Sequence, residues 1–196
     1  MSARRDLRPG RPALLIAALV VAACSSGSGD AAPPHDSGGT GTSPTIARPE
    51  VPEVPSPAPT GTGVVVVGGT TSSFAVTACR LEPDPAEPAG ARTLVTLEGA
   101  GTTGSGVAFT IELQRFATGT DVVTFTDTVT YSDTARILQA QRIEVGGQVT
   151  DLRDPKAATS LVRTRSDGVS AAGLASAPGD GPDDGGLIGL ALTASC

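Results

Sequence analysis

Hydrophobic and polar residues alternate along the C-terminal two thirds of the chain with the period of two that is typical of β-strands. In residues 107–114, apolar side chains occupy the odd positions and mostly polar ones the even positions. Residues 123–131 repeat this pattern, with Asp127 as the one polar residue among the odd positions and threonines at the even ones. Because residues 117–120 separate the two runs and include a glycine, we predict a β-hairpin there.

The same patterning predicts seven further strands, at residues 64–67, 73–80, 93–98, 136–145, 160–165, 169–175 and 187–195. Residues 134–144 are ambiguous, because Ser132 or Asp133 could cap a helix there. The even spacing of the apolar residues between 137 and 145 favours a strand instead. Short strands, glycine-rich turns and no long amphipathic helix predict an all-β domain, either an antiparallel β-sandwich or a partly open, barrel-like sheet.

The N-terminal end has a different pattern. An apolar run at residues 13–23 follows four arginines, at positions 4, 5, 8 and 11, and ends at Cys24. This is the order of a secretory signal peptide. The segment Val21-Ala22-Ala23-Cys24 resembles the lipobox of bacterial lipoproteins, in which the cysteine receives a diacylglyceryl group and becomes the new N-terminus. We therefore predict a signal peptide at residues 1–23 and a lipid on Cys24.

Two alternatives for this segment differ in how the chain meets the membrane. As a helix, 11 residues would span only about 16 Å, roughly half of a bilayer core, which argues against a transmembrane segment. An ordinary secreted protein is the other alternative. The Arg4-Arg5 pair leaves twin-arginine export open beside the general secretory route.

Residues 25–60 read as a linker with eight prolines. The densest part, residues 48–59, favours polyproline II, because each proline fixes φ and removes a donor. We therefore predict a lipidated Cys24 with a disordered tether at residues 24–60 and a single β-rich domain at residues 61–196. Serines and threonines among the prolines are candidate O-glycosylation sites. His35, the one histidine, is expected to be inert in this tether.

The charge balance excludes some partners. The chain carries 14 basic and 20 acidic residues. Removal of residues 1–23, with four arginines and one aspartate, leaves 10 against 19, a net charge of −9. Such a surface is repelled by nucleic acid, so the predicted partner is the membrane itself, through the acyl chains on Cys24.

Two cysteines remain once Cys24 is acylated, Cys79 in an early strand and Cys196 at the last position. Export places them in an oxidising compartment, where a disulfide persists. A catalytic thiol would need a neighbouring base, and residues 61–196 contain no histidine. The same absence removes a Ser-His-Asp triad and the commonest nitrogen ligand of zinc. We predict no enzymatic activity, no cofactor and no metal.

Two apparent motifs fail on their context. Residues 99–104 match the glycine spacing of a dinucleotide-binding loop, but a strand pattern follows where a helix is required, so a flexible turn is expected. Residues 180–185 are similar to a calcium loop, but Pro182 occupies a ligand position and no glutamate stands at the twelfth. An ordinary solvated loop is expected there.

The order of the lipobox, the Ser/Thr/Pro tether, the segment 74–79, the hairpin 162–173 and the terminal run 187–196 resembles the small mycobacterial lipoprotein antigen family. The composition is also typical of an actinobacterial protein. The resemblance implies an anchored surface antigen, often glycosylated, whose acyl chains are sensed by host innate receptors. It supports Cys24 as the lipid site and Cys79 with Cys196 as a disulfide, and it supplies no catalytic residue.

Two functional hypotheses follow. The first is a non-catalytic envelope lipoprotein of the antigen type, on the outer face of the membrane, with a protein or glycan partner or none. The second is a module that carries a lipid or another small apolar ligand. An apolar cavity of about 300 Å³ or more between two sheets favours the second, and a filled core favours the first.

Overall fold

The fold is known from a computed structural model, which describes residues 48–151, 153–154, 157, 159–180 and 186–196. These residues form strands and no helix. The strands are β1 (Thr62–Val67), β2 (Thr70–Arg80), β3 (Ala91–Thr102), β4 (Ala108–Thr118), β5 (Thr124–Asp133), β6 (Ile137–Val145), β7 (Gln148–Thr150), β8 (Val162–Arg165), β9 (Gly168–Ala175) and β10 (Ile188–Ser195). All of them pair antiparallel in one sheet, in the order β7-β6-β5-β4-β3-β2-β1-β10-β9-β8. The predicted all-β antiparallel fold is therefore confirmed.

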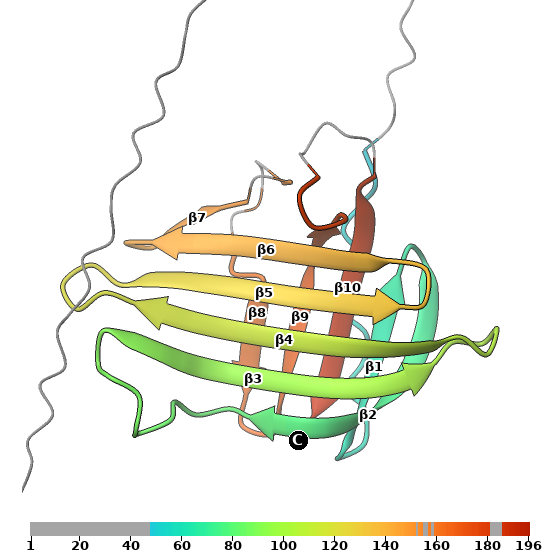
Figure 1. Cartoon of the computed structure of the whole chain (residues 1–196), viewed down its shortest axis with the longest axis horizontal. Coiled ribbons are helices and arrows are strands. Elements are labelled where there is room, and N and C mark those ends of the chain that lie inside the picture. The colour runs from blue at the N-terminus through green and yellow to red at the C-terminus, as the bar shows by residue number, and fades with distance from the viewer. Residues whose placement is uncertain (1–47, 152, 155–156, 158, 181–185) are drawn as a thin grey trace, which may run out of the picture. The chain divides into compact units, whose positions relative to one another are not determined.

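The sheet curls until its two ends approach each other. In Figure 1, β3 to β6 lie in front and β1, β8, β9 and β10 cross steeply behind them. The long strand β2 bridges the two layers, and its register shifts between Val76 and Ala78, where a bulge lets the strand bend. Gln139 of β6 and Ser176, the residue after β9, exchange two backbone hydrogen bonds of 2.8 and 3.2 Å. The result is a half-barrel, which matches the partly open alternative of the prediction.

Alternate side chains of the front strands fill the inside of this curl. The odd positions 109–113 of β4 and 127–131 of β5 are buried, with Ile111 and Val129 at 0% exposure. From the rear strands, Val65, Leu190 and Leu192 are equally buried. The alternation of the sequence therefore corresponds to an inner and an outer face, as predicted.

In the segment 134–144, which was ambiguous between helix and strand, residues 137–144 belong to β6 and residues 134–136 form the turn before it. Asp133 does not cap a helix. Its Oδ1 accepts hydrogen bonds from the backbone N–H groups of Ala135 and Arg136, at 2.8 and 2.9 Å, and so closes the β5–β6 turn. The short strand β7, which the sequence pattern does not predict, pairs with the end of β6.

The expected flexible turn at residues 99–104 is wrong for its first four residues. Residues 99–102 are the end of β3, and the turn begins only at Thr103. The glycines serve packing: a Cβ at Gly99 would lie 2.7 Å from Cε2 of Phe74, and one at Gly101 would lie 2.6 Å from the carbonyl oxygen of Ser73. A side chain at either position would overlap its neighbours, so the strand needs glycine there.

Residues 48–60, which we call the strap, lie along the outer face of β10. Near one end, a Cβ on Gly189 would meet the carbonyl oxygen of Glu50 at 2.6 Å and Pro52 at 2.7 Å. Near the other end, the Ser195 hydroxyl donates to the Ala58 carbonyl at 2.7 Å. The strap therefore runs parallel to β10.

The compact unit of the fold includes the strap, so it begins before the boundary that the sequence suggested at residue 61. Prolines cannot donate to a ladder, and for that reason the strap covers a face of the sheet and does not extend its edge.

Candidate functional site

Cys79 and Cys196 are the predicted site residues that the structure brings together. Their Cα atoms are 5.9 Å apart and their sulfurs are within bonding distance, although 117 positions separate them. The topology explains the meeting, because β2 and β10 flank β1 and both extend beyond its first residue. Cys24 and His35 lie outside the described residues, as does most of the calcium-like loop.

A network of charged side chains joins β4, β5 and β6 to the segment before β8. Arg115 contacts Asp127 Oδ2 and Glu144 Oε2, each at 3.3 Å. The same Asp127 oxygen accepts the backbone N–H of Val162 at 3.0 Å, and Glu144 accepts the hydroxyl of Ser160 at 2.9 Å. These contacts tie the two ends of the curled sheet together.

A second group of ionic and polar contacts lies further along β6. Arg142 donates from Nε to Asp151 at 3.0 Å and from Nη1 to the Thr159 carbonyl at 2.8 Å. Arg153 donates from Nε to the Ser176 hydroxyl at 2.7 Å. Arg142 and Asp151 are both nearly buried, so this pair is shielded from solvent.

Asp127 has the most perturbed environment of this network. Burial raises the pKa of its carboxyl, against the opposing effects of the Val162 N–H and of Arg115. Within the described part of the chain, its Oδ1 is buried without a hydrogen-bond partner. A buried carboxyl with a raised pKa is a feature of many catalytic sites. Here the residue is 3% exposed and its neighbours are the groups that close the half-barrel, so the contacts that it makes are structural ones.

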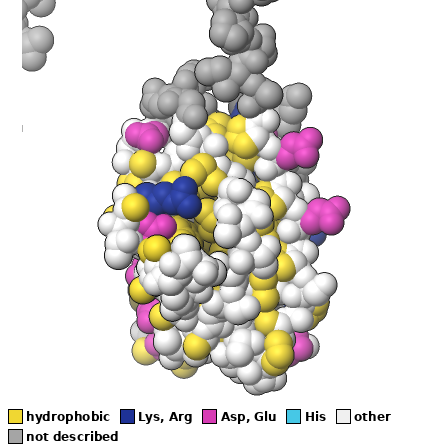
Figure 2. Space-filling model, turned by 90° about the vertical axis from the view of Figure 1, so that its right-hand side faces the viewer, with side chains coloured by type: hydrophobic (Ala, Val, Ile, Leu, Met, Phe, Trp, Pro, Cys, Tyr) yellow, Lys and Arg dark blue, Asp and Glu magenta, His cyan; other side chains and the backbone are white. Residues whose placement is uncertain are grey.

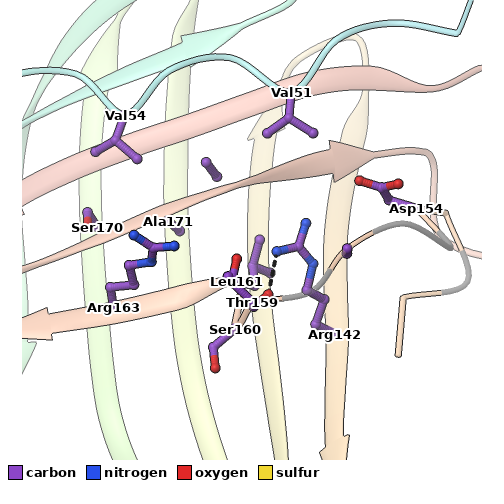
Figure 3. A pocket seen from close by; sticks show the side chains of 12 residues that line it. Val51, Val54, Arg142, Asp154, Thr159, Ser160, Leu161, Arg163, Ser170 and Ala171 are labelled. Atoms are coloured by element: carbon purple, nitrogen blue, oxygen red, sulfur yellow. Dashed lines mark hydrogen bonds between the residues drawn. The ribbon is translucent and has the colours of Figure 1, made fainter. Parts of the chain in front are cut away.

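A cavity of about 350 Å³ lies between the strap and the strands β8 and β9. We call it the strap cavity. Its residues come from the strap (Val51 and Val54), from β8 and the segment before it (159–161 and Arg163) and from β9 (170–172). Figure 3 shows both valines directed from the strap toward the opposite wall and Arg163 reaching toward Val54.

Charged groups give this cavity its polarity. Arg142 and Arg163 both line it, and Asp154 does so as well. Arg163 and Asp154 lie at opposite ends of the cavity in Figure 3. Among the described residues, no ion pair or hydrogen bond holds the Arg163 guanidinium, whereas Arg142 is fixed by Asp151 and Thr159. The cavity therefore combines an apolar wall with one unpaired cation.

A second hollow, of about 260 Å³, lies at the end of the half-barrel where the β1–β2, β3–β4 and β5–β6 turns gather. Figure 2 shows hydrophobic side chains inside it and a basic side chain next to an acidic one at its rim. Tyr131 lines it and stacks on Phe109, with ring centroids 5.3 Å apart. Burial first, and then a hydrogen bond to Asp133, raise the pKa of the Tyr131 hydroxyl. Arg136 lies over the same ring, 5.9 Å from its centroid.

An open groove of about 660 Å³ lies between the other end of the strap and the strands β1, β2 and β3. Its lining includes Pro55, Pro59, Val64 and Ala75 and no charged residue. In the part of the chain that the structure describes, no three His, Cys, Asp or Glu side chains are placed to hold a metal ion. Nor does that part contain a helix long and apolar enough to cross a membrane.

Comparisons with protein-family models, with curated proteins and with solved structures found no match for this chain.

Sequence reasoning missed the strap cavity because its residues are far apart in the chain. Val51 and Val54 lie more than 100 positions before Arg163. One signal was present: these are the two valines of an otherwise proline-rich and polar segment, at a spacing of three residues. In polyproline II, which has three residues per turn, that spacing places both side chains on the same side.

Proposed function

We propose that this chain is an exported, non-catalytic envelope lipoprotein of the surface-antigen type, held on the outer face of the cell membrane by a lipid on Cys24. The observation that carries the proposal is the approach of Cys79 and Cys196 to bonding distance. Such a bond persists in oxidising compartments, where an exported chain is located. The signal-peptide pattern and the lipobox-like segment before Cys24 support the same address.

The interior of the half-barrel supports a role in display over a role in carrying a lipid inside the fold. The apolar residues between the front and rear strands are packed to 0–4% exposure over most of the core. Of the cavities named above, two lie at the strap and one lies at the end of the half-barrel, where Val65, Val67 and Tyr131 end the packed core. A filled interior is the result that the first hypothesis expects.

Mass spectrometry of the protein purified without reduction from a native membrane fraction tests the proposal. The expected result is an N-terminal peptide that begins at an acylated Cys24, together with a linked peptide that contains Cys79 and Cys196. The matched control is Cys24→Ala, which should move the protein to the soluble fraction with the Cys79–Cys196 peptide intact. A wild-type protein with an unmodified N-terminus in the soluble fraction would refute the anchor, and free thiols at 79 and 196 would refute the export argument.

A further inference from the structure

The strap cavity holds a positive charge in a chain of net charge −6. Arg163 lies on β8, an exposed strand at the edge of the sheet. Its guanidinium has no anionic partner among the described residues, while Arg115, Arg136 and Arg142 each have one. Arginine presents a planar set of donors that fits a carboxylate with two parallel hydrogen bonds. An anionic group at this end of the cavity would find that set of donors free.

The rest of the cavity wall is largely aliphatic. Val51 and Val54 are 37% and 38% exposed, the large apolar side chains of the strap, and both face the cavity (Figure 3). Leu161 and Ala171 continue the apolar wall from the opposite side. An occupant with a hydrocarbon portion would cover the two exposed valines and remove them from water. A purely polar anion, such as inorganic phosphate, would leave them exposed.

Arg142 and Asp154, the other charged residues of the described lining, bear on the orientation that a bound ligand would take. Arg142 is paired with the buried Asp151 and donates to the Thr159 carbonyl, so its charge is largely balanced and Arg163 remains the free cation of the described lining. Asp154 lies at the end away from Arg163 (Figure 3). The anionic head of a ligand is therefore favoured at the Arg163 end, and its chain is directed along the two valines.

We propose that the strap cavity binds an anionic amphiphile, a medium-chain fatty acid or a similar carboxylate, with Arg163 holding the head group and Val51 and Val54 covering the chain. At about 350 Å³ the cavity is near the lower end of the range for ligand pockets, about 300 to 1,000 Å³. That size fits one short acyl chain and excludes a two-chain phospholipid. The site belongs to the β domain and does not rest on lipidation of Cys24.

Calorimetric titration of decanoate into the exported full-length chain tests the site. The chain carries Cys24→Ser, so that no acyl group of its own competes, and decanoate is kept below its micelle concentration. We expect one saturable site per chain. Decanol has the same chain and no charge. Its affinity should be lower by about tenfold or more, because a charge-assisted hydrogen bond is lost.

Variants separate the site from general attraction to a basic strand. Arg163→Gln should weaken decanoate binding about tenfold and leave the weak decanol binding unchanged. Arg165→Gln, on the same strand and outside the cavity lining, is the matched control and should bind decanoate as the parent does. Val54→Ser should weaken both ligands. Because Arg163 has no partner among the described residues, Arg163→Gln should keep the melting temperature of the parent.

Three outcomes would overturn the proposal. The first is no saturable decanoate binding by the parent chain. The second is decanol binding as tight as decanoate binding, which would refute the head-group assignment. The third is an equal loss of affinity in Arg163→Gln and Arg165→Gln, which would reduce the effect to net charge. None of these results depends on whether the native protein carries a lipid on Cys24, so the site and the anchor are tested separately.

Discussion

Replacement of Gly63 by alanine should destabilise the domain by displacing the ring of Phe74. A Cβ at Gly63 would lie 2.6 Å from Cε1 and Cε2 of this ring and closer still to Cζ. Carbon atoms pack at about 3.5 to 4.0 Å, so the ring would have to move by about 1 Å or more. The ring is 3% exposed and also lies against Gly99 on β3, which leaves it little room to shift. Overpacking of this kind costs about 1 to 3 kcal/mol, and we expect about 2 to 3 here.

A double-mutant cycle isolates this contact from other effects of the substitution. Phe74→Ala alone should cost about 3 to 5 kcal/mol, because it empties a buried aromatic site. In that background Gly63→Ala no longer meets a ring, and alanine should gain about 0.5 to 1 kcal/mol over glycine within a strand. The coupling between the two positions is therefore about 3 kcal/mol.

Urea unfolding of the four oxidised variants measures the coupling. Gly104→Ala is a suitable control, because nothing lies within 4 Å of its added Cβ, and it should change stability by less than about 0.5 kcal/mol. The reasoning is refuted if Gly63→Ala costs as much in the Phe74→Ala background as in the parent.

The remaining predictions concern the charged groups and the disulfide. Burial raises the pKa of Asp127 above 3.8, so the carboxyl contributes stability below that pH and loses this contribution as the pH rises through its pKa in the folded state. The free energy of unfolding of Asp127→Asn should therefore increase relative to that of the parent as the pH rises from 3 to 7. The hydrogen bond from the Ala135 N–H lowers the pKa of Asp133, so the stability that this carboxylate contributes is lost as the pH falls. The free energy of unfolding of Asp133→Asn, measured in urea, should therefore decrease relative to that of the parent as the pH rises from 3 to 7. If the free energies of unfolding of both variants followed that of the parent at every pH, both assignments would be contradicted. Arg115→Met leaves the Asp127 carboxyl without its cation and should lower the free energy of unfolding by about 3 kcal/mol, whereas an unchanged urea midpoint would show that the pair does not hold the seam. The double variant Cys79→Ser/Cys196→Ser should lose about 4 to 5 kcal/mol of stability, since the bond closes a loop of more than 100 residues, and a loss below about 1 kcal/mol would mean that the bond is absent or the unfolded chain is already compact.

The sequence predicts the strands well where one face of the sheet is buried and the other is exposed. The hairpin of β4 and β5 is the clearest case, because buried residues alternate with more exposed ones over 108–114 and over 126–132. It predicts β10 as a strand but not its surroundings. Residues 189–194 are buried on both faces, and an apolar run without alternation does not reveal what covers it.

The strap and the glycines of β3 could not be predicted for related reasons. Proline-rich segments are expected in linkers, since they cannot pair in a ladder, and the sequence gives no sign that this one lies on a strand. Glycines are expected in turns, yet Gly99 is a strand residue because the Phe74 ring occupies the space of its side chain. In both cases the deciding contact comes from a residue distant in the chain.

The attachment of the strap determines how the domain bears a mechanical load. Ala58 accepts a hydrogen bond from Ser195, the residue before Cys196, and Cys196 is joined to Cys79 on β2. Tension applied along the strap from its N-terminal end therefore acts in shear over the length of β10, a central strand paired with both β1 and β9. The edge strands β7 and β8 are not on this path, so tension on the strap does not act first on the edges of the sheet.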